Sequence, residues 1–360
     1  MRESFRRGAR AVAARLFAGL VAAVVTVVPL SAASAQADGR SLPRTDAEER
    51  QAVLEKLEDL LPDGLLADAL RRLPEGVDLS DLKLLENLLQ NTGPPVPERD
   101  FSWQIGLRIK GSTGRCGGIL ISERYILTAA HCLDRNAVDA PGPASRYDVS
   151  EVEAFRSSDR FAERPVALDA TWPLKIHDEY KSGGPLYSFD AALARLASPI
   201  TDATPAPVGR RPFAEGPAVT SGWGDHPTDG SGILRAVEVL VVDPVLCRDE
   251  LAPERWDQLG PATICTVDSA ADSCARDSGG PLVAGTRRAP QTIGVVSWGG
   301  NPGCGVAGPS GGLLGAYTRA SSIADWVTRE TGDSSAVTND RPGTLMNVVS
   351  IEQFLRGLEQ

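Results

Sequence analysis

Ser278 lies in a short stretch of sequence that could make it a nucleophile. Residues 272–281 read DSCARDSGGP, which places the serine between Asp277 and the pair Gly279 and Gly280. A serine hydroxyl attacks well only when a base removes its proton. The two glycines let the chain turn sharply and keep bulky side chains away from the hydroxyl. This pattern indicates nucleophilic catalysis, which requires a base elsewhere in the chain.

The base has few candidates, because the chain has only three histidines. His177, in IHDEY, and His226, in GDHPTDG, lie in polar, turn-like stretches that are typical of surface or satisfied core residues. His131 follows an apolar run in ILTAAHC and directly precedes a cysteine, so a disulfide could anchor it. Asp190, in SFDAALARL, is an acid at the start of an apolar run. It could orient the imidazole and offset its charge, or it could simply cap a strand or helix.

The elements that must position these residues begin near Phe101. From there onward, Gly- and Pro-rich turns separate short apolar runs, among them WQIGLRI, GGILIS, RYILTAA, AVEVLVV and TIGVVSW. Regularly spaced short strands without intervening helices predict an all-β sandwich or barrel. One late helix is expected from the pattern SSIADWVTRE, with its cap at Ser321 or Ser322.

Residues 1–37 are predicted to be a signal peptide. A basic start, MRESFRRGAR, precedes the apolar run LFAGLVAAVVTVVPL, and small residues then offer cleavage sites after Ala35 or Ala37. The alternative is an uncleaved anchor helix, whose apolar stretch would be short for a membrane span. We therefore expect a secreted, extracellular protein, with the cell surface or periplasm as alternatives. No stable membrane insertion is expected after the signal is removed.

Residues 38–98 are expected to form a separate helical segment with a linker. TDAE, residues 45–48, resembles a capping box, and leucines follow it at helical spacing. GPPVPERD, residues 93–100, is typical of a stiff linker. The segment would be a propeptide or a small helical cap, or alternatively an inhibitory or docking module. Residues 331–360 are expected to be a C-terminal extension that begins as a polar tail and ends in a small helix.

Charge and cysteine content limit the partners and cofactors. The net charge of -10 argues against nucleic acid, which proteins bind with clustered basic groups. An even number of cysteines in an exported chain usually means disulfides, although the count does not show which ones pair. Zinc is disfavoured because the chain has no C-x-x-C pair, so we expect no metal and no organic cofactor. The cysteines are Cys116, Cys132, Cys247, Cys265, Cys274 and Cys304.

Several stretches together resemble the chymotrypsin family of serine proteases. They are ISERYILTAAHC, FDAALARLASPI, SGWG, DSCARDSGGP and SWGG…GAYTRASSIADWV, in that family's order and at compatible spacing. The resemblance extends from about Phe101 to Arg329, within an expected protease domain of residues 99–330. It implies two six-stranded antiparallel β-barrels and a C-terminal helix, with the active site in the cleft between the barrels.

The resemblance also implies a role for each residue of the site. His131 would be the general base and then the acid, Asp190 would orient it, and Ser278 would attack the scissile carbonyl to give an acyl-enzyme. The backbone N–H groups of Ser278 and Arg276 would form the oxyanion hole. The implied disulfides are Cys116–Cys132, Cys247–Cys265 and Cys274–Cys304.

Asp272 would set the specificity. It lies six residues before the serine, where trypsin-like members of the family carry an aspartate at the base of the primary pocket. Its carboxylate would bind a substrate arginine or lysine, unless Asp272 is an ordinary acid in a turn. Gly299 and Gly315 match the positions of the pocket walls. Together with Ser297 and Trp298, Gly299 should pair with the substrate backbone as an added strand.

Two features depart from the family's pattern. Arg276 occupies the usual glycine position of the oxyanion hole, where a left-handed backbone would cost a non-glycine residue about 1–2 kcal/mol. The peptide could instead flip and leave the hole unformed. In addition, no Ile-Val-Gly-Gly sequence occurs near residue 90, where the family's activating cut would fall. Asp277, which binds the freed terminus in the family, therefore needs some other cation or hydrogen-bond donor.

The sequence as a whole predicts a secreted serine endopeptidase that cuts polypeptides after arginine or lysine. Protein inhibitors could bind the same cleft. The excess of arginine over lysine favours a bacterial gene. The alternative is a protease-like binding or regulatory module with little turnover, which Arg276 and the missing activation sequence favour.

Overall fold

The computed structural model describes one of the two compact units into which the chain divides. All of the described residues belong to the unit Gln90–Val348. The expected signal peptide, N-terminal helices and final helix lie outside the described residues, as does His226. The described residues are Val96, 98–137, 144–157, 163–180, 188–224, 234–249, 251, 259–268, 273–299 and 313–342.

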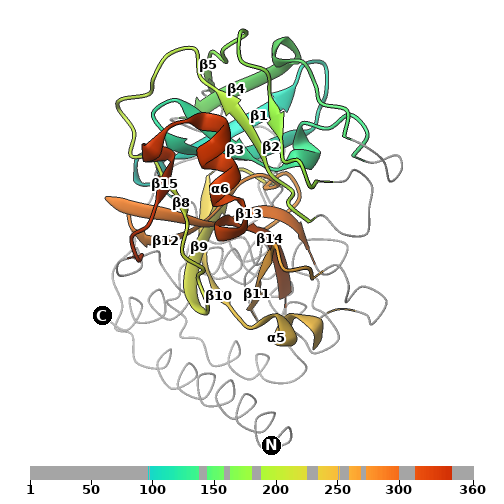
Figure 1. Ribbon diagram of the computed structural model, residues 1–360, viewed down its shortest axis with the longest axis vertical. Coiled ribbons are helices and arrows are strands. Elements are labelled where there is room, and N and C mark those ends of the chain that lie inside the picture. The colour runs from blue at the N-terminus through green and yellow to red at the C-terminus, as the bar shows by residue number, and fades with distance from the viewer. Residues whose placement is uncertain are drawn as a thin grey trace, which may run out of the picture. The chain divides into compact units, whose positions relative to one another are not determined.

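The first half of the described chain forms a seven-stranded sheet in the order β5-β4-β1-β2-β3-β7-β6. Strands β1 to β5 of this sheet are labelled in Figure 1. The sheet closes on itself, because the N–H of Asp169 donates to the Arg195 carbonyl at 2.8 Å and that of Ala197 to the Ala167 carbonyl at 2.9 Å. The chain just after β5 thus pairs with the end of β7. The strands are β1 (Gln104–Ile109), β2 (Arg115–Ser122), β3 (Tyr125–Thr128), β4 (Val152–Ser157), β5 (Glu163–Val166), β6 (Lys175–Ile176) and β7 (Ala192–Arg195).

The second half forms an eight-stranded sheet in the order β12-β9-β10-β11-β14-β13-β8-β15. An additional pairing of β12 with β13 closes six of these strands into a barrel. The predicted all-β fold with two barrels is therefore confirmed. The strands are β8 (Val208–Gly209), β9 (Gly216–Gly222), β10 (Arg235–Val241), β11 (Thr263–Asp268), β12 (Pro281–Thr286), β13 (Ala289–Gly299), β14 (Leu313–Arg319) and β15 (Val337–Thr338).

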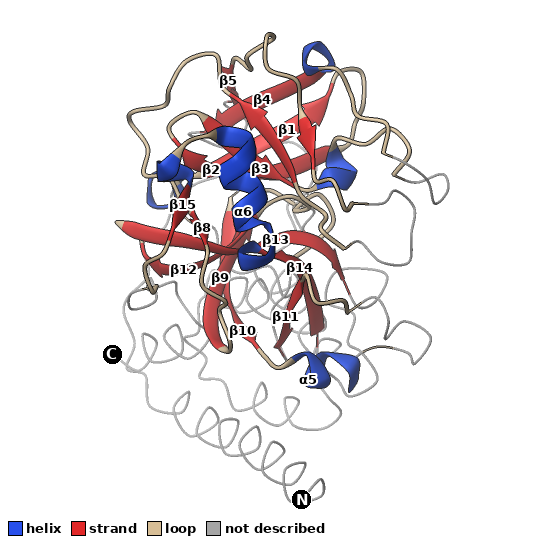
Figure 2. Cartoon of the chain, viewed as in Figure 1, coloured by secondary structure: helices blue, strands red, loops and turns tan. Residues whose placement is uncertain are grey.

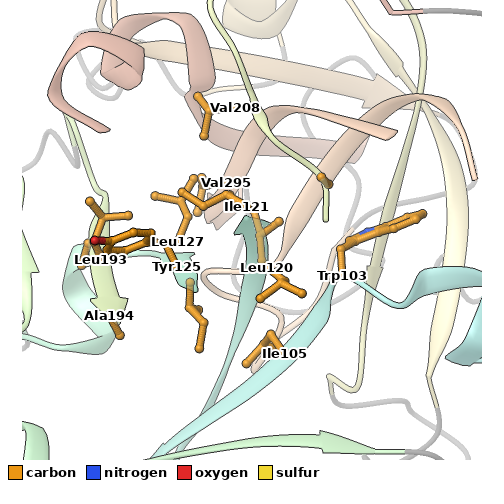
Figure 3. Packing of buried hydrophobic residues seen from close by; sticks show 14 of the residues in the cluster. Trp103, Ile105, Leu120, Ile121, Tyr125, Leu127, Leu193, Ala194, Val208 and Val295 are labelled. Carbon is orange, nitrogen blue, oxygen red and sulfur yellow. The ribbon is translucent and has the colours of Figure 1, made fainter. Parts of the chain in front are cut away.

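The apolar runs of the sequence become strands because both faces of several strands are buried. Neighbouring residues Leu120 and Ile121 of β2 are each 0% exposed, although their side chains point to opposite faces of the sheet (Figure 3). Val208 and Val295 of the second sheet belong to the same cluster. Each such side chain contributes about 1.5–3 kcal/mol on burial. This shared core joins the two barrels and holds the segments between them.

The main helix, α6 (Ala320–Thr331), packs against β8 and β13 (Figure 2). The predicted cap at Ser321 or Ser322 is wrong: Arg319, the last residue of β14, is the N-cap, and its side chain forms no cap hydrogen bond. The helix begins directly from an extended strand, so both serines lie in its first turn. The other helices are η2 (Glu98–Phe101), η3 (Ala130–Cys132), η4 (Val149–Glu151), α5 (Pro244–Asp249) and η6 (Ser334–Ala336).

Part of the expected C-terminal tail is ordered structure. After α6 and its C-cap Gly332, η6 leads into β15, whose Val337 pairs in parallel with Val208 of β8. None of the helices in the described ranges has the length and hydrophobicity that a membrane span requires.

Candidate active site

His131 and Asp190 meet because of the register of two neighbouring strands. β3 and β7 are antiparallel, with Thr128 opposite Ala192. The residues that follow β3 therefore lie beside those that precede β7. His131 is in η3, just after β3, and its Nδ1 lies 2.7 Å from Oδ2 of Asp190. Its backbone N–H donates to Oδ1 of the same carboxylate at 2.9 Å.

Asp190 is fully buried, and its surroundings compensate its charge. The Ser297 hydroxyl donates to Oδ2 at 2.5 Å, and the Thr318 hydroxyl donates to the Asp190 carbonyl at 2.9 Å. A buried carboxylate without such donors would be costly. From the sequence, Ser297 was expected only in a substrate-binding strand, and its contact with Asp190 was not predicted. Ser297 and Asp190 lie 107 residues apart, so no local pattern points to it.

The contact with Asp190 determines the protonation of His131. An ionised carboxylate only accepts hydrogen bonds, so Nδ1 carries the hydrogen and the lone pair is on Nε2. Burial lowers the pKa of His131, but the charge of Asp190 and its hydrogen bond, with a smaller effect of Asp134, raise the pKa above its ordinary value of 6.5. The imidazole side chain remains 20% exposed. It can therefore act as a base toward a group that approaches from the solvent side.

The turn that carries Ser278 packs against the histidine segment of the first barrel. The Gly117 N–H of β2 donates to the Ser278 carbonyl at 2.7 Å. Sγ of Cys132, the residue after His131, lies 3.6 Å from the same carbonyl oxygen. Cys132 is in turn joined by a disulfide to Cys116 of β2. The serine turn and the histidine segment are thus held together through β2.

Gly279 is required by this close approach. Its φ is 80°, in the left-handed region. A Cβ there would lie 2.2 Å from Oγ1 of Thr128 and 2.5 Å from the carbonyl oxygen of Gly117. Any side chain at this position would therefore push the serine turn away from the first barrel.

Arg276 has a left-handed backbone, with φ 74°. Of the two alternatives for this position, strain or a flipped peptide, the strained backbone is the one observed. It costs roughly 1–2 kcal/mol for a residue that carries a Cβ. The amide N–H of Ser278, two residues later, donates to no carbonyl within the described ranges. That donor is therefore available to a ligand.

Asp277 receives two hydrogen bonds from backbone N–H groups. Its Oδ1 accepts from the Gly224 N–H at 2.8 Å, and its Oδ2 accepts from the Cys274 N–H at 2.9 Å. A Cβ on Gly224 would lie 2.6 Å from the carboxylate, so the second glycine of SGWG is needed for this contact. These two amides are thus among the hydrogen-bond donors that Asp277 needs.

The residues expected to line the primary pocket lie on β13 and β14. Gly299 and Gly315 are directly opposite each other, and Trp298 is opposite Ala316. Ser297 is buried, Trp298 is half-buried and Gly299 is exposed. Asp272, which would supply the charge of the pocket, lies outside the described residues.

The structure forms the disulfides Cys116–Cys132 and Cys247–Cys265. Cys274 is also disulfide-bonded, whereas Cys304 lies outside the described residues. The donor atoms of Cys116, His131 and Cys132 lie within 4.8 Å of one another, an arrangement that can hold a metal. Here both sulfurs belong to one disulfide, so they are not the thiolates that bind zinc.

Two β-barrels that meet at a partly exposed histidine paired with a buried aspartate, beside a serine in a glycine-rich turn, define a chymotrypsin-like fold and site. The model of the trypsin family matches residues 90–327 of the chain. The chain belongs to the trypsin family, and the protein is a serine endopeptidase.

Proteins similar to this chain include a trypsin and a transmembrane serine protease. Hypodermin-B of Hypoderma lineatum is 32% identical over 237 residues, which cover 64% of this chain and 82% of that protein. Trypsin iota of Drosophila melanogaster is 29% identical over 248 residues, 66% of this chain and 87% of that protein. Transmembrane protease serine 11C of Mus musculus is 30% identical over 251 residues, 67% of this chain and 53% of that protein. These are animal proteins, and they do not support the bacterial origin that the arginine content favours.

Proposed function

We propose that the protein hydrolyses polypeptides after arginine or lysine, with Ser278 as nucleophile, His131 as base and Asp190 as the residue that orients the base. One observation carries the proposal. The carboxylate of Asp190 binds both Nδ1 and the backbone N–H of His131, at 2.7 and 2.9 Å. This double contact favours the tautomer whose Nε2 can accept a proton.

In the proposed first step, Nε2 of His131 takes the hydroxyl proton as Oγ of Ser278 attacks the scissile carbonyl carbon. The carbonyl electron pair moves to its oxygen and gives a tetrahedral intermediate. When this collapses, the C–N bond breaks and the imidazolium protonates the leaving amine. Water then attacks the acyl-enzyme by the same route. The buried charge of Asp190 stabilises the imidazolium in both steps.

The oxyanion hole would consist of the backbone N–H groups of Ser278 and Arg276. Each donor of this kind contributes about 3–4 kcal/mol to transition-state stabilisation. Support comes from the Ser278 amide, which makes no backbone hydrogen bond within the described part of the chain. The second candidate function, a protease-like module with little turnover, would instead require a flipped peptide at Arg276, whose φ is 74°.

Specificity for basic residues rests on Asp272 and on the absence of side chains at the pocket walls. Gly299 and Gly315 lie opposite each other on the paired strands β13 and β14, so neither puts a side chain into the proposed pocket. A long cationic side chain could then reach a carboxylate at the base of the pocket. Ser297, Trp298 and Gly299 would pair with the substrate backbone as an added strand.

Export fits the disulfides of the described chain, which form and persist in oxidising compartments. We propose that residues 1–37 are removed on export, that residues 38–98 form a propeptide or accessory segment, and that residues 99–330 form the protease domain. Residues 331–360 would be a C-terminal extension. Protein inhibitors are proposed partners of the substrate cleft.

A fluorophosphonate probe tests the proposal on the exported full-length protein. Such probes react with an activated serine, so the wild-type protein should be labelled at Ser278 and the Ser278→Ala variant should not. An unlabelled wild-type protein would refute the proposed enzyme and favour the module with little turnover. Labelling of both proteins would show that another residue is the nucleophile.

A further inference from the structure

Phe189, the residue directly before Asp190, has an unusual backbone. Its φ is 55°, and only Phe189 and Arg276 combine a side chain with a positive φ in the described part of the chain. A bulky aromatic residue rarely adopts this conformation. The Ala191 N–H donates to the Phe189 carbonyl at 2.7 Å, which closes a tight turn around Asp190. The backbone of Phe189 therefore helps to determine where the Asp190 carboxylate points.

An aromatic stack holds this residue. The Phe189 ring lies on the His177 ring, with centroids 4.7 Å apart and planes 12° apart. His177 also contacts Trp326 of α6, with centroids 4.9 Å apart. His177 is 6% exposed and Trp326 is 3% exposed. His177 is therefore a buried core residue, although its context in the sequence is polar and turn-like.

His177 binds the turn around Asp190 at both ends. Its ring stacks on Phe189, and its backbone N–H donates to the Ala191 carbonyl at 2.9 Å. Its own orientation is fixed, because Nδ1 accepts from the Glu179 N–H at 3.2 Å. The two residues that flank Asp190 are therefore both anchored to one buried histidine.

We propose that Phe189 is a positioning residue, whose ring, stacked on His177, keeps the turn in the conformation that directs the Asp190 carboxylate to His131. The inference rests on the proposed function, in which Asp190 orients the base. Without the ring, a residue with a Cβ would leave the left-handed region for a more favourable one. The turn would then rotate, and the carboxylate would lose its alignment with Nδ1.

The titration of His131 reports this alignment. Burial lowers the pKa of His177, and Arg329 acts in the same direction, against Glu179, Asp178 and Glu330, which raise it. His177 is therefore uncharged where His131 titrates, since the pKa of His131 is raised, largely by Asp190. A misplaced Asp190 should lower the pKa of His131 and move the acid limb of kcat/KM to lower pH.

The test compares Phe189→Ala with Phe189→Gly in the exported protein. Alanine removes the ring and keeps the Cβ, so kcat should fall roughly tenfold or more, with KM changed by less than about threefold, and the acid limb should move down. Glycine also removes the ring, but it adopts the left-handed conformation freely and should recover most of kcat. If Phe189 only packs, glycine would do no better than alanine and neither would move the acid limb. Either result would overturn the proposal.

Further variants keep the test decisive. Trp172→Ala removes a ring that contacts Tyr125 in the same barrel, at 5.6 Å between centroids, and it should leave the acid limb in place. If Phe189→Ala does not fold, His177→Asn removes the stacking face but keeps an acceptor for the Glu179 N–H. It should lower the pKa of His131 in the same way, and an unchanged pKa would count against the proposal.

Proton NMR of the His131 ring tests the positioning role of Phe189 separately from the proposed proteolytic function. The pKa of His131 can be measured in a catalytically inactive protein, with Asp190→Asn as the reference for complete loss of the contact. If the wild-type protein does not react with the fluorophosphonate probe, the proposed function fails. A pKa that still falls in Phe189→Ala would nevertheless support the positioning role, and a pKa that does not fall would refute it.

Discussion

Replacing Asp190 by asparagine should inactivate the base, although both the nucleophile Ser278 and the base His131 remain in place. The His131 backbone N–H can only donate, so it keeps an oxygen of the new amide at the position of Oδ1, 2.9 Å away. The amide nitrogen must then occupy the position of Oδ2, 2.7 Å from Nδ1 of His131. Because that nitrogen also donates, Nδ1 becomes an acceptor and the imidazole proton moves to Nε2. In this tautomer Nε2 cannot take the proton of Ser278.

The expected loss in kcat is about 10⁴-fold, equivalent to about 5.5 kcal/mol, with little change in KM. The assay is kcat and KM on a short arginyl peptide across neutral and mildly acid pH. The wild-type acid limb should lie above pH 6.5, because a base must be neutral and the pKa of His131 is raised. In the variant the limb should move to lower pH, since the charge of Asp190 is gone. A loss below about tenfold, or a limb that does not move, would refute the assignment of Asp190.

Three other outcomes follow from the site. Arg276→Gly should raise the free energy of unfolding by about 1 kcal/mol, because glycine adopts the left-handed backbone without strain. It should leave kcat on short peptides unchanged, because the left-handed backbone is already present before substrate binds. A rise in kcat of about tenfold would instead show an oxyanion hole that is unformed in the free enzyme. Asp272→Ser should lower activity on arginyl and lysyl peptides more than about tenfold, whereas a wild-type preference for leucine or phenylalanine would exclude the acidic pocket. Proteins that begin at Asp38 and at Gly93 should both be active in an active-site titration, because backbone N–H groups already bind Asp277; activity that appears only after a cut near residue 90 would contradict this.

Much of the fold could be predicted from short stretches of sequence. The runs WQIGLRI, GGILIS and RYILTAA correspond to β1, β2 and β3, because apolar runs this short that are bounded by turn residues have the length of a strand and not of a helix. The start of α6 could not be predicted in this way. Ser321 looks like a cap, but the cap position is occupied by Arg319, because the preceding strand pairs with β13 as far as that residue.

The sequence by itself determined which residue types stand at the candidate site, since each lies in a short motif whose glycines, cysteine or apolar neighbours can be seen locally. Only the tertiary structure decided what surrounds them. The hydroxyl of Ser297 reaches Asp190 from 107 residues away, and Asp277 finds the Gly224 amide 53 residues away. The stack of Phe189 on His177 and Trp326 likewise joins the first barrel to the C-terminal helix. Hydrogen bonds and ring contacts act over a few ångströms of space, and folding brings together segments whose separation along the chain leaves no periodic trace in the sequence.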